Sequence, residues 1–211
     1  DFYWFTEKNN YIFIAAVDCT GHGIPGAFMS IIGINLLNSI VNEDISDPSI
    51  ILNMMNKKVI LTLKKTLDSG HLKDGMDMSL SVIDKNRKTI NFSSAYNPVY
   101  IIRNDNIIQF KGERKSVGND FDFNSFSTFS VKIREDDVVY LFSDGYTDQF
   151  GGTEQKKFKF RRFRFVLLSI YQLPPEKQKE KLKTTFEKWM LDNEQVDDIL
   201  IIGFKPMSFI K

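Results

Sequence analysis

The sequence predicts an α+β domain in which mainly antiparallel strands form layers beside grouped helices. Three observations lead to this prediction. The expected order is a strand, two helices, a long series of strands, two helices and a closing strand. Successive strands in the middle of the chain are joined by short turns, as in hairpins, and not by the crossover helices of a doubly wound parallel sheet. Of the 211 residues, 42% are hydrophobic, which is enough for the core of one domain.

The first third of the chain is expected to contain one buried strand and two helices. Residues 11–17 form an uninterrupted apolar run rich in β-branched and aromatic residues, which is typical of a buried strand. A helix is expected over residues 25–41, where a proline lies in the first turn and apolar residues recur at helical spacing. Residues 48–67 are expected to form a second amphipathic helix.

The remainder is expected to be mostly strands until a pair of helices near the end. Apolar and polar residues alternate, and turn-forming residues separate the alternating segments. The expected strands are 78–82, 90–92, 99–102, 107–110, 126–133, 138–143 and 198–204. A loop is expected at Gly151 and Gly152, and helices are expected over 163–171 and 175–193.

Bulk composition narrows the class of partner and the compartment. The net charge of +1 gives no reason to expect nucleic acid or an anionic membrane as a partner. Cys19 is the single cysteine, so an internal disulfide is excluded and a cytoplasmic location is expected. No apolar run approaches the ~20 residues of a membrane span.

Because Asp1 begins a strand-like run, we expect residues 1–211 to be one domain of a longer protein, without its first strand.

One segment carries a competing signal for nucleic acid. Residues 156–165 alternate basic and aromatic side chains, a pattern that can bind single-stranded nucleic acid. We interpret the segment instead as the start of a helix whose phenylalanines enter the core while its arginines face water.

Acidic residues recur at the ends of apolar strands. Asp18 follows the strand expected at 11–17, Asp144 follows the one at 138–143, Asp197 precedes the closing strand, and Asp1 opens the chain. A carboxylate at the mouth of a buried strand is costly unless it is paired or binds a cation. The repetition indicates strand ends that converge on a shared cation site.

The available ligand types favour hard cations. Oxygen ligands suit Mg²⁺ or Mn²⁺, whereas Zn²⁺ usually takes Cys and His, of which the chain offers only Cys19, His22 and His71. Two such cations about 3.5–4 Å apart can activate a water molecule and clamp a phosphoryl group. These residues alone leave a phosphatase, a nuclease and a cyclase open.

Several motifs together resemble one family. The segment Asp18-Cys-Thr-Gly-His-Gly23 resembles the Asp-x-x-Gly-His-Gly signature of SpoIIE-type phosphatases, a bacterial branch of the type 2C (PPM) serine/threonine protein phosphatases. Further motifs of that family are matched by five other segments. These are the opening Asp1-Phe-Tyr, the segments Ser143-Asp-Gly and Asp197-Asp-Ile-Leu, and the turns at 94–98 and 116–118, each of which resembles its counterpart. They occur in the family's order and span nearly the whole chain.

The resemblance implies a fold, a reaction and a set of site residues. The fold would be an α/β/β/α sandwich of two stacked, mainly antiparallel sheets flanked by helix pairs. The reaction would be hydrolysis of phosphoserine or phosphothreonine by a water or hydroxide activated between two divalent cations, Mn²⁺ or Mg²⁺. Asp18 and Asp144 would be catalytic. The metal ligands implied by the family are Asp1, Asp18, the carbonyl of Cys19, Asp144 and Asp197.

The resemblance also implies partners in bacterial signalling. We expect a phosphorylated protein substrate, for which an anti-anti-sigma-type protein is a candidate, and a fused upstream sensor domain, with a membrane tether of the full-length protein left open. A homodimer stays open. The alternative function is a catalytically inactive sensor or scaffold domain with the same fold.

Some residues have open roles. Asp74, Asp77 and Asp148 are candidates for an additional metal, although solvated turns explain them as well. His22 is interpreted as a residue that shapes its turn, and Trp4 stands where many family members carry a second Asp.

Overall fold

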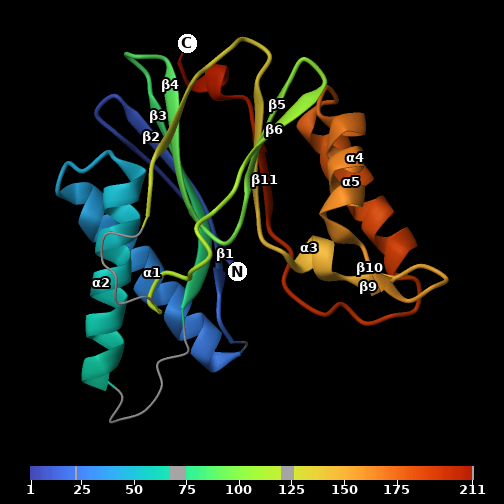
Figure 1. Cartoon of the computed structure of the whole chain (residues 1–211), viewed down its shortest axis with the longest axis horizontal. Helices are drawn as coiled ribbons and strands as arrows, with labels where there is room; N and C mark the ends of the chain where they lie inside the picture. Colours follow the sequence, from blue (N-terminus) through green and yellow to red (C-terminus); the bar gives the residue numbers. More distant parts are fainter. Residues whose placement is uncertain (22, 67–74, 120–125, 211) are drawn as a thin grey trace.

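Two antiparallel sheets stack face to face between two layers of helices, as the computed structural model shows for residues 1–21, 23–66, 75–119 and 126–210 (Figure 1). The first sheet has the strand order β1-β2-β3-β4-β7. Its strands are β1 (Phe2–Lys8), β2 (Tyr11–Cys19), β3 (Met76–Asp84), β4 (Thr89–Ala95) and β7 (Phe129–Lys132). The expected α+β class and the α/β/β/α layering are confirmed.

The second sheet has the strand order β11-β8-β5-β6, and all its pairings are antiparallel. Its strands are β5 (Val99–Arg103), β6 (Asn106–Phe110), β8 (Val138–Phe142) and β11 (Ile201–Phe204). A separate small hairpin joins β9 (Phe150–Gly151) and β10 (Lys156–Lys157).

The helices cover the two outer faces of the sheet pair. In Figure 1, α1 (Ile24–Asn42) and α2 (Pro48–Thr66) lie against the first sheet, and α4 (Lys159–Ile170) and α5 (Pro175–Met190) lie against the second. The short α3 (Gly145–Asp148) follows β8, and a 3₁₀ turn at Pro206–Phe209 follows β11.

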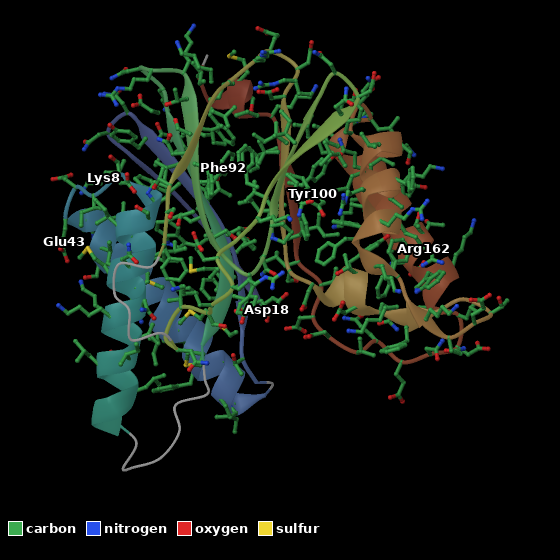
Figure 2. The ribbon with its side chains drawn as sticks, in the orientation of Figure 1. Lys8, Asp18, Glu43, Phe92, Tyr100 and Arg162 are labelled. Atoms are coloured by element: carbon green, nitrogen blue, oxygen red, sulfur yellow. The ribbon has the colours of Figure 1, made fainter. Side chains whose placement is uncertain are left out.

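The period of two along each strand divides the apolar residues among separate layers of core. On β5, Tyr100 and Ile102 face the helices, whereas Val99 and Ile101 face the first sheet. Figure 2 shows Phe92 between the sheets and Tyr100 on the side of α4. Strands buried on both faces need apolar residues at every position, which explains the continuous run at 11–17.

Several element boundaries differ from the sequence predictions. The strand β2 extends to Cys19, so Asp18 lies within the strand and not after it. The strand expected over 126–133 is limited to Phe129–Lys132, and the closing strand begins at Ile201. The region expected to be a loop near Gly151 contains β9 and β10. Strand ends depend on the partner that supplies hydrogen bonds, and local residue pattern does not reveal that partner.

Helix α1 carries large apolar side chains on the face that points away from the first sheet, as well as on the face that packs against it. Met29, Leu37 and Ile40 are buried, whereas Phe28 and Ile31 are more than half exposed. By length and composition α1 could cross a membrane, contrary to the sequence prediction that no run approaches that length. A core helix passes the same test, and one face of α1 packs on the first sheet.

The basic and aromatic segment is tied into the fold. Phe158 and Phe163 are buried, as the helix-start interpretation predicts, although Phe165 is exposed. The Arg162 guanidinium lies 4.4 Å from the centre of the Trp189 ring. These contacts favour a structural role for residues 156–165.

Asp47 holds the start of α2. Its Oδ1 accepts hydrogen bonds from the backbone nitrogen of Ser49 at 2.8 Å, from that of Ile50 at 3.3 Å, and from the Thr128 hydroxyl at 2.6 Å. Burial alone would raise the pKa of Asp47, but the hydrogen bonds from Thr128 and Ser49 outweigh it and lower the pKa. The carboxylate therefore caps α2 and ties the helix to the segment before β7.

We expect Asp47→Ala to lower the free energy of unfolding at pH 7 by about 1–2 kcal/mol, the usual cost of losing a helix cap. Because the folded pKa lies below the unfolded value of about 3.9, this stabilisation is present above that value and is lost as the pH falls through the folded pKa. Urea unfolding at pH 7 and at about pH 3 should show a smaller difference in acid. Asp136→Ala, in an exposed turn, is the control; an equal Asp47→Ala effect at both pH values would contradict a role for the charge.

Candidate functional site

Acidic residues from three neighbouring strands lie at one end of the first sheet. The register of β2 with β3 pairs Asp18 directly with Asp77. The register of β1 with β2 pairs Phe2 with Val17, so Asp1 lies beside Asp18 at the same end. Paired side chains on one face of antiparallel strands have Cβ atoms about 4.5–5.5 Å apart. Figure 2 shows Asp18 near the lower end of the two sheets and between them, with α1 and α2 extending below it.

The second sheet brings two further acidic segments to the same edge. Asp144 follows β8, and Asp197 lies just before β11, which pairs with β8. Ser143 fixes the two segments together, because its backbone nitrogen donates to the Leu200 carbonyl at 3.0 Å and its hydroxyl accepts from the Leu200 nitrogen at 3.1 Å. Both acidic segments are therefore anchored to the ends of paired strands.

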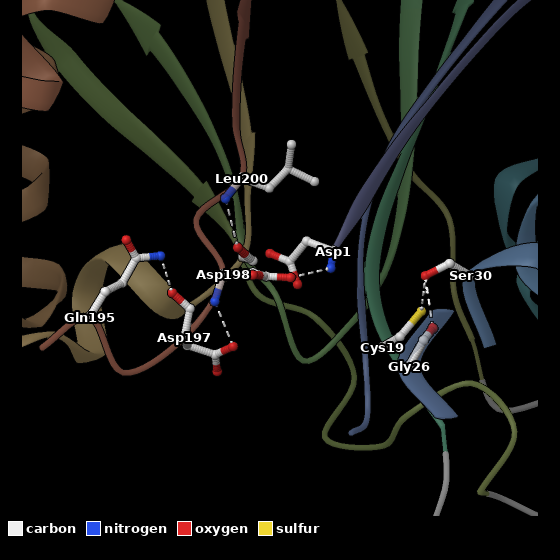
Figure 3. Close-up of polar contacts among 9 residues, drawn as sticks. Asp1, Cys19, Gly26, Ser30, Gln195, Asp197, Asp198 and Leu200 are labelled. Carbon is white, nitrogen blue, oxygen red and sulfur yellow. Dashed lines mark hydrogen bonds and ion pairs between the residues drawn. The ribbon is translucent and has the colours of Figure 1, made fainter. Parts of the chain in front are cut away.

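A contact between the sheets joins Asp1 to Asp198. The main-chain nitrogen of Asp1 donates to Asp198 Oδ2 at 2.8 Å, as Figure 3 shows. The Oδ2 atom of Asp1 is itself buried and has no hydrogen-bond partner among the residues that the structure describes. A buried carboxylate oxygen without a partner is costly unless a cation or another donor satisfies it.

Gly145 sets the spacing between the two acidic segments of the second sheet. A Cβ atom at this position would lie 1.9 Å from the carbonyl oxygen of Asp198 and 3.4 Å from the Cβ of Asp197. Any side chain would push the 197–198 segment away from Asp144. The glycine after Asp144 is therefore required for close backbone approach.

The cluster is electrostatically strained in the absence of positive charge. Burial, followed by repulsion from Asp144, Asp197 and Asp77, raises the pKa of Asp18 to about 7. Burial also raises the pKa of Asp144 and of Asp77, and repulsion from Asp148 and Asp197 adds to the effect at Asp144. Like charges that share a desolvated site require a compensating cation or bound protons.

The Cys19 side chain points away from the acidic cluster. Its buried thiol lies 3.6 Å from the Ser30 hydroxyl on α1, on the helix side of the sheet (Figure 3). Burial raises the pKa of this thiol, which keeps it protonated and makes it a poor nucleophile. The carbonyl of Cys19, and not its sulfur, stays the predicted ligand. Trp4 also faces the helices, where its indole nitrogen donates to Asn38 Oδ1 at 2.9 Å.

Sequence reasoning underestimated Asp77. The sequence leaves a solvated turn as one explanation of Asp77, but this residue lies within β3, opposite Asp18, and accepts a hydrogen bond from the Ser116 hydroxyl at 2.5 Å. Only the strand register reveals that pairing. Asp148 lies close enough to Asp144 to raise its pKa, and it forms an ion pair with Lys157 at 2.6 Å. His22, His71 and Asp74 lie outside the described residues.

The donor atoms of the acidic cluster are of the type that hard cations prefer, although the side chains do not surround a single point. Carboxylate oxygens dominate, and the unpartnered Asp1 Oδ2 and the mutual repulsion at Asp18 both call for positive charge. Within the described ranges, no three His, Cys, Asp or Glu side chains already stand in an arrangement that could hold a metal ion.

Comparison with solved structures defines the class of fold. The SiaA-PP2C domain of Pseudomonas aeruginosa aligns with a TM-score of 0.85 and 27% identity, over 97% of this chain and 79% of that one. The PP2C phosphatase domain of SpoIIE from Bacillus subtilis, with a fragment of its regulatory domain, aligns with a TM-score of 0.74 and 20% identity, over 95% of this chain and 56% of that one. The fold is therefore that of PP2C phosphatase domains.

A further solved structure, of the RsbU and RsbW domains of a Mycobacterium tuberculosis protein, has a TM-score of 0.68 and 16% identity, over 95% of this chain and 54% of that one. No curated protein matches the sequence significantly. The family model for stage II sporulation protein E (SpoIIE) matches residues 8–206. The chain belongs to the SpoIIE family of phosphatase domains, as the motifs predicted.

We expect Gly145→Ala to weaken Mn²⁺ binding by about tenfold or more, the effect typical of disturbing groups that orient metal ligands. The added methyl group would displace the 197–198 segment from Asp144. Isothermal titration calorimetry with Mn²⁺ measures the change, and circular dichroism checks the fold. Asp136→Ala is the control, because it removes an exposed carboxylate from the turn between β7 and β8 and should leave the Mn²⁺ affinity unchanged. Equal affinity of Gly145→Ala and wild type would contradict the spacing role.

Proposed function

We propose that this domain hydrolyses phosphoserine or phosphothreonine on a partner protein, with two divalent cations, Mn²⁺ or Mg²⁺, held at the acidic edge of the sandwich. The observation that carries the proposal is the convergence of Asp18, Asp144 and Asp197 from two sheets into one partly desolvated cluster, which raises the pKa of Asp18 to about 7. Membership of a phosphatase family and the PP2C fold support this reaction over a nuclease or a cyclase.

The proposed ligands are Asp1, Asp18, the carbonyl of Cys19, Asp144 and Asp197. When bound, the cations would neutralise the phosphoryl group and activate water for in-line attack. Asp18 lies on β2, is paired with Asp77 of β3, and would hold the cations together with Asp144 and Asp197 of the second sheet. Asp144 is held by the Ser143 anchor, and Gly145 sets its distance from the 197–198 segment. Rigid strand ends would thus hold the reacting phosphate in a fixed geometry.

The partner would be a phosphoprotein of bacterial signalling. The RsbU and RsbW domains named for the Mycobacterium tuberculosis structure support a regulatory setting, and an anti-anti-sigma-type protein is the candidate substrate. The same proposal includes that residues 1–211 form a single domain with a fused upstream sensor. It also includes a cytoplasmic location and a homodimer. Residues 156–165 do not favour nucleic acid, because Arg162 stacks on Trp189 and Lys157 pairs with Asp148.

We expect wild type to hydrolyse p-nitrophenyl phosphate and a phosphoserine peptide with Mn²⁺ or Mg²⁺ but not with chelator. Asp18→Ala should reduce kcat/KM by more than about 100-fold, beyond the 10–100-fold typical of outer partners of a metal ligand. Phosphate release measures turnover. The change in Tm on adding Mn²⁺ reports binding without turnover, since a ligand of the native state raises Tm.

The control is Asp136→Ala, which removes an exposed carboxylate from a turn between β7 and β8. It should match wild type in turnover and in the Mn²⁺-induced Tm shift. A wild type that binds Mn²⁺ yet hydrolyses neither substrate would favour the inactive scaffold. Turnover that survives chelation would contradict the metal mechanism.

A further inference from the structure

A polar pocket opens beside the acidic cluster on the first sheet. It has a volume of about 350 Å³ and is lined by Tyr96, Arg114, Lys115, Ser116 and Asn119. No acidic side chain lines this described part of the surface, so the pocket, here named the Tyr96–Arg114 pocket, carries positive charge next to a centre of negative charge.

Ser116 connects the pocket to the acidic cluster. Its hydroxyl donates to Asp77 Oδ1 at 2.5 Å, and Asp77 is paired with Asp18 across β3 and β2. Paired residues are about 5 Å apart, so the near wall of the pocket lies roughly 10 Å from Asp18. An extended peptide advances about 3.3 Å per residue. A group in the pocket would therefore lie two or three residues from a phosphorylated residue at Asp18.

The pocket walls are held in place by backbone hydrogen bonds. The Tyr96 nitrogen donates to the Glu113 carbonyl at 2.8 Å, and the Glu113 nitrogen donates to the Ser94 carbonyl at 2.8 Å. Met76 and Val117 exchange two backbone bonds, of 2.8 and 2.9 Å. The 113–117 segment is thus fixed to the ends of β3 and β4, the same strands that position Asp77.

Tyr96 occupies a backbone conformation that a tyrosine rarely adopts. Its φ is +57°, in the left-handed region that favours glycine, and its side chain is 50% exposed. The Asn97 nitrogen donates to the Ala95 carbonyl at 2.7 Å, so Tyr96 lies at the centre of a tight turn that presents its ring at the pocket.

Arg114 and Lys115 both bring positive charge to the pocket, and Arg114 is the more exposed of the two. It is exposed, and among the described residues it has no ion pair or hydrogen bond. A guanidinium binds a carboxylate through two parallel hydrogen bonds, which makes it selective for a planar anion. The pocket therefore offers a ready partner for an acidic side chain.

We propose that the Tyr96–Arg114 pocket binds an acidic side chain of the protein substrate, two or three residues from the phosphorylated residue. This inference rests on the proposed phosphatase function and narrows its substrate class to phosphoserine or phosphothreonine sites flanked by Asp or Glu. Arg114 binds the carboxylate, and the Tyr96 ring packs against the peptide chain.

The test compares phosphoserine peptides that differ at the positions two and three residues from the phosphoserine, carrying Glu, Gln or Lys. For wild type with Mn²⁺, we expect kcat/KM for the Glu peptide to exceed that for the Gln peptide by about tenfold, the scale of one charged hydrogen bond. In Arg114→Ala the ratio should fall to about one through KM, and in Arg114→Glu the Lys peptide should become the preferred substrate.

Two further variants separate recognition from structure. Arg161→Ala, which removes an exposed arginine from α4, should keep the wild-type ratio. Tyr96→Gly should keep or raise Tm, because glycine relieves the positive φ, yet it should reduce the preference for the Glu peptide. Loss of preference without loss of stability supports the pocket.

Two outcomes would overturn the proposal. One is an Arg114→Ala variant in which the ratio of kcat/KM for the Glu peptide to that for the Gln peptide is unchanged. The other is an equal fall in kcat/KM for every peptide and for p-nitrophenyl phosphate, which would place Arg114 on the phosphoryl group itself. Fluorescence anisotropy of the same labelled peptides measures binding without turnover. If wild type hydrolyses none of the substrates, the proposed function fails, and the anisotropy ratio alone then supports or overturns the pocket.

Discussion

Repulsion among carboxylates is the constraint around which the rest of this structure is arranged. Asp18, Asp77, Asp144 and Asp197 come from both sheets to one edge, and burial together with mutual repulsion raises the pKa of Asp18 to about 7. Such an arrangement opposes folding unless the two sheets are held firmly together. The apolar layer between them, which includes Phe92, provides that stability.

Local fixing of the backbone keeps the acidic segments at the edge. Ser143 binds the backbone on both sides of Leu200, and the nitrogen of Asp1 bridges the sheets to Asp198. Gly145 allows the backbone of Asp198 to approach more closely than any side chain would permit. Two of the carboxylates also take part, since Asp198 Oδ2 accepts from the Asp1 nitrogen and Asp197 Oδ1 accepts from the Asp198 nitrogen at 2.8 Å. The arrangement matches the general rule that sites on strand ends are held more precisely than sites on free loops.

The same edge also combines opposite charges at short range. The acidic cluster attracts cations, while the neighbouring Tyr96–Arg114 pocket is suited to an anion. Ser116 lies at the boundary and bonds to Asp77. A phosphoprotein carries two kinds of negative group, the phosphate and nearby carboxylates. In the proposed arrangement the phosphate would meet cations and the carboxylate would meet a guanidinium, so neither would have to face the aspartates directly.

The sequence alone predicted most of the strands and helices, the class of fold and the kinds of chemical group at the site, but not β9, β10 or several strand ends. These features depend on residues that are neighbours in the chain: apolar runs, the alternation of apolar and polar residues along strands, and prolines at helix starts. The family motifs around Asp18 and Asp144 are local in the same sense. Tertiary structure decided the partners: the pairing of Asp77 with Asp18, the contact of Asp1 with Asp198, and the outward face of α1 at Phe28. Strand register and sheet stacking join residues far apart in the chain, and a one-residue change of register would move every side chain to the opposite face.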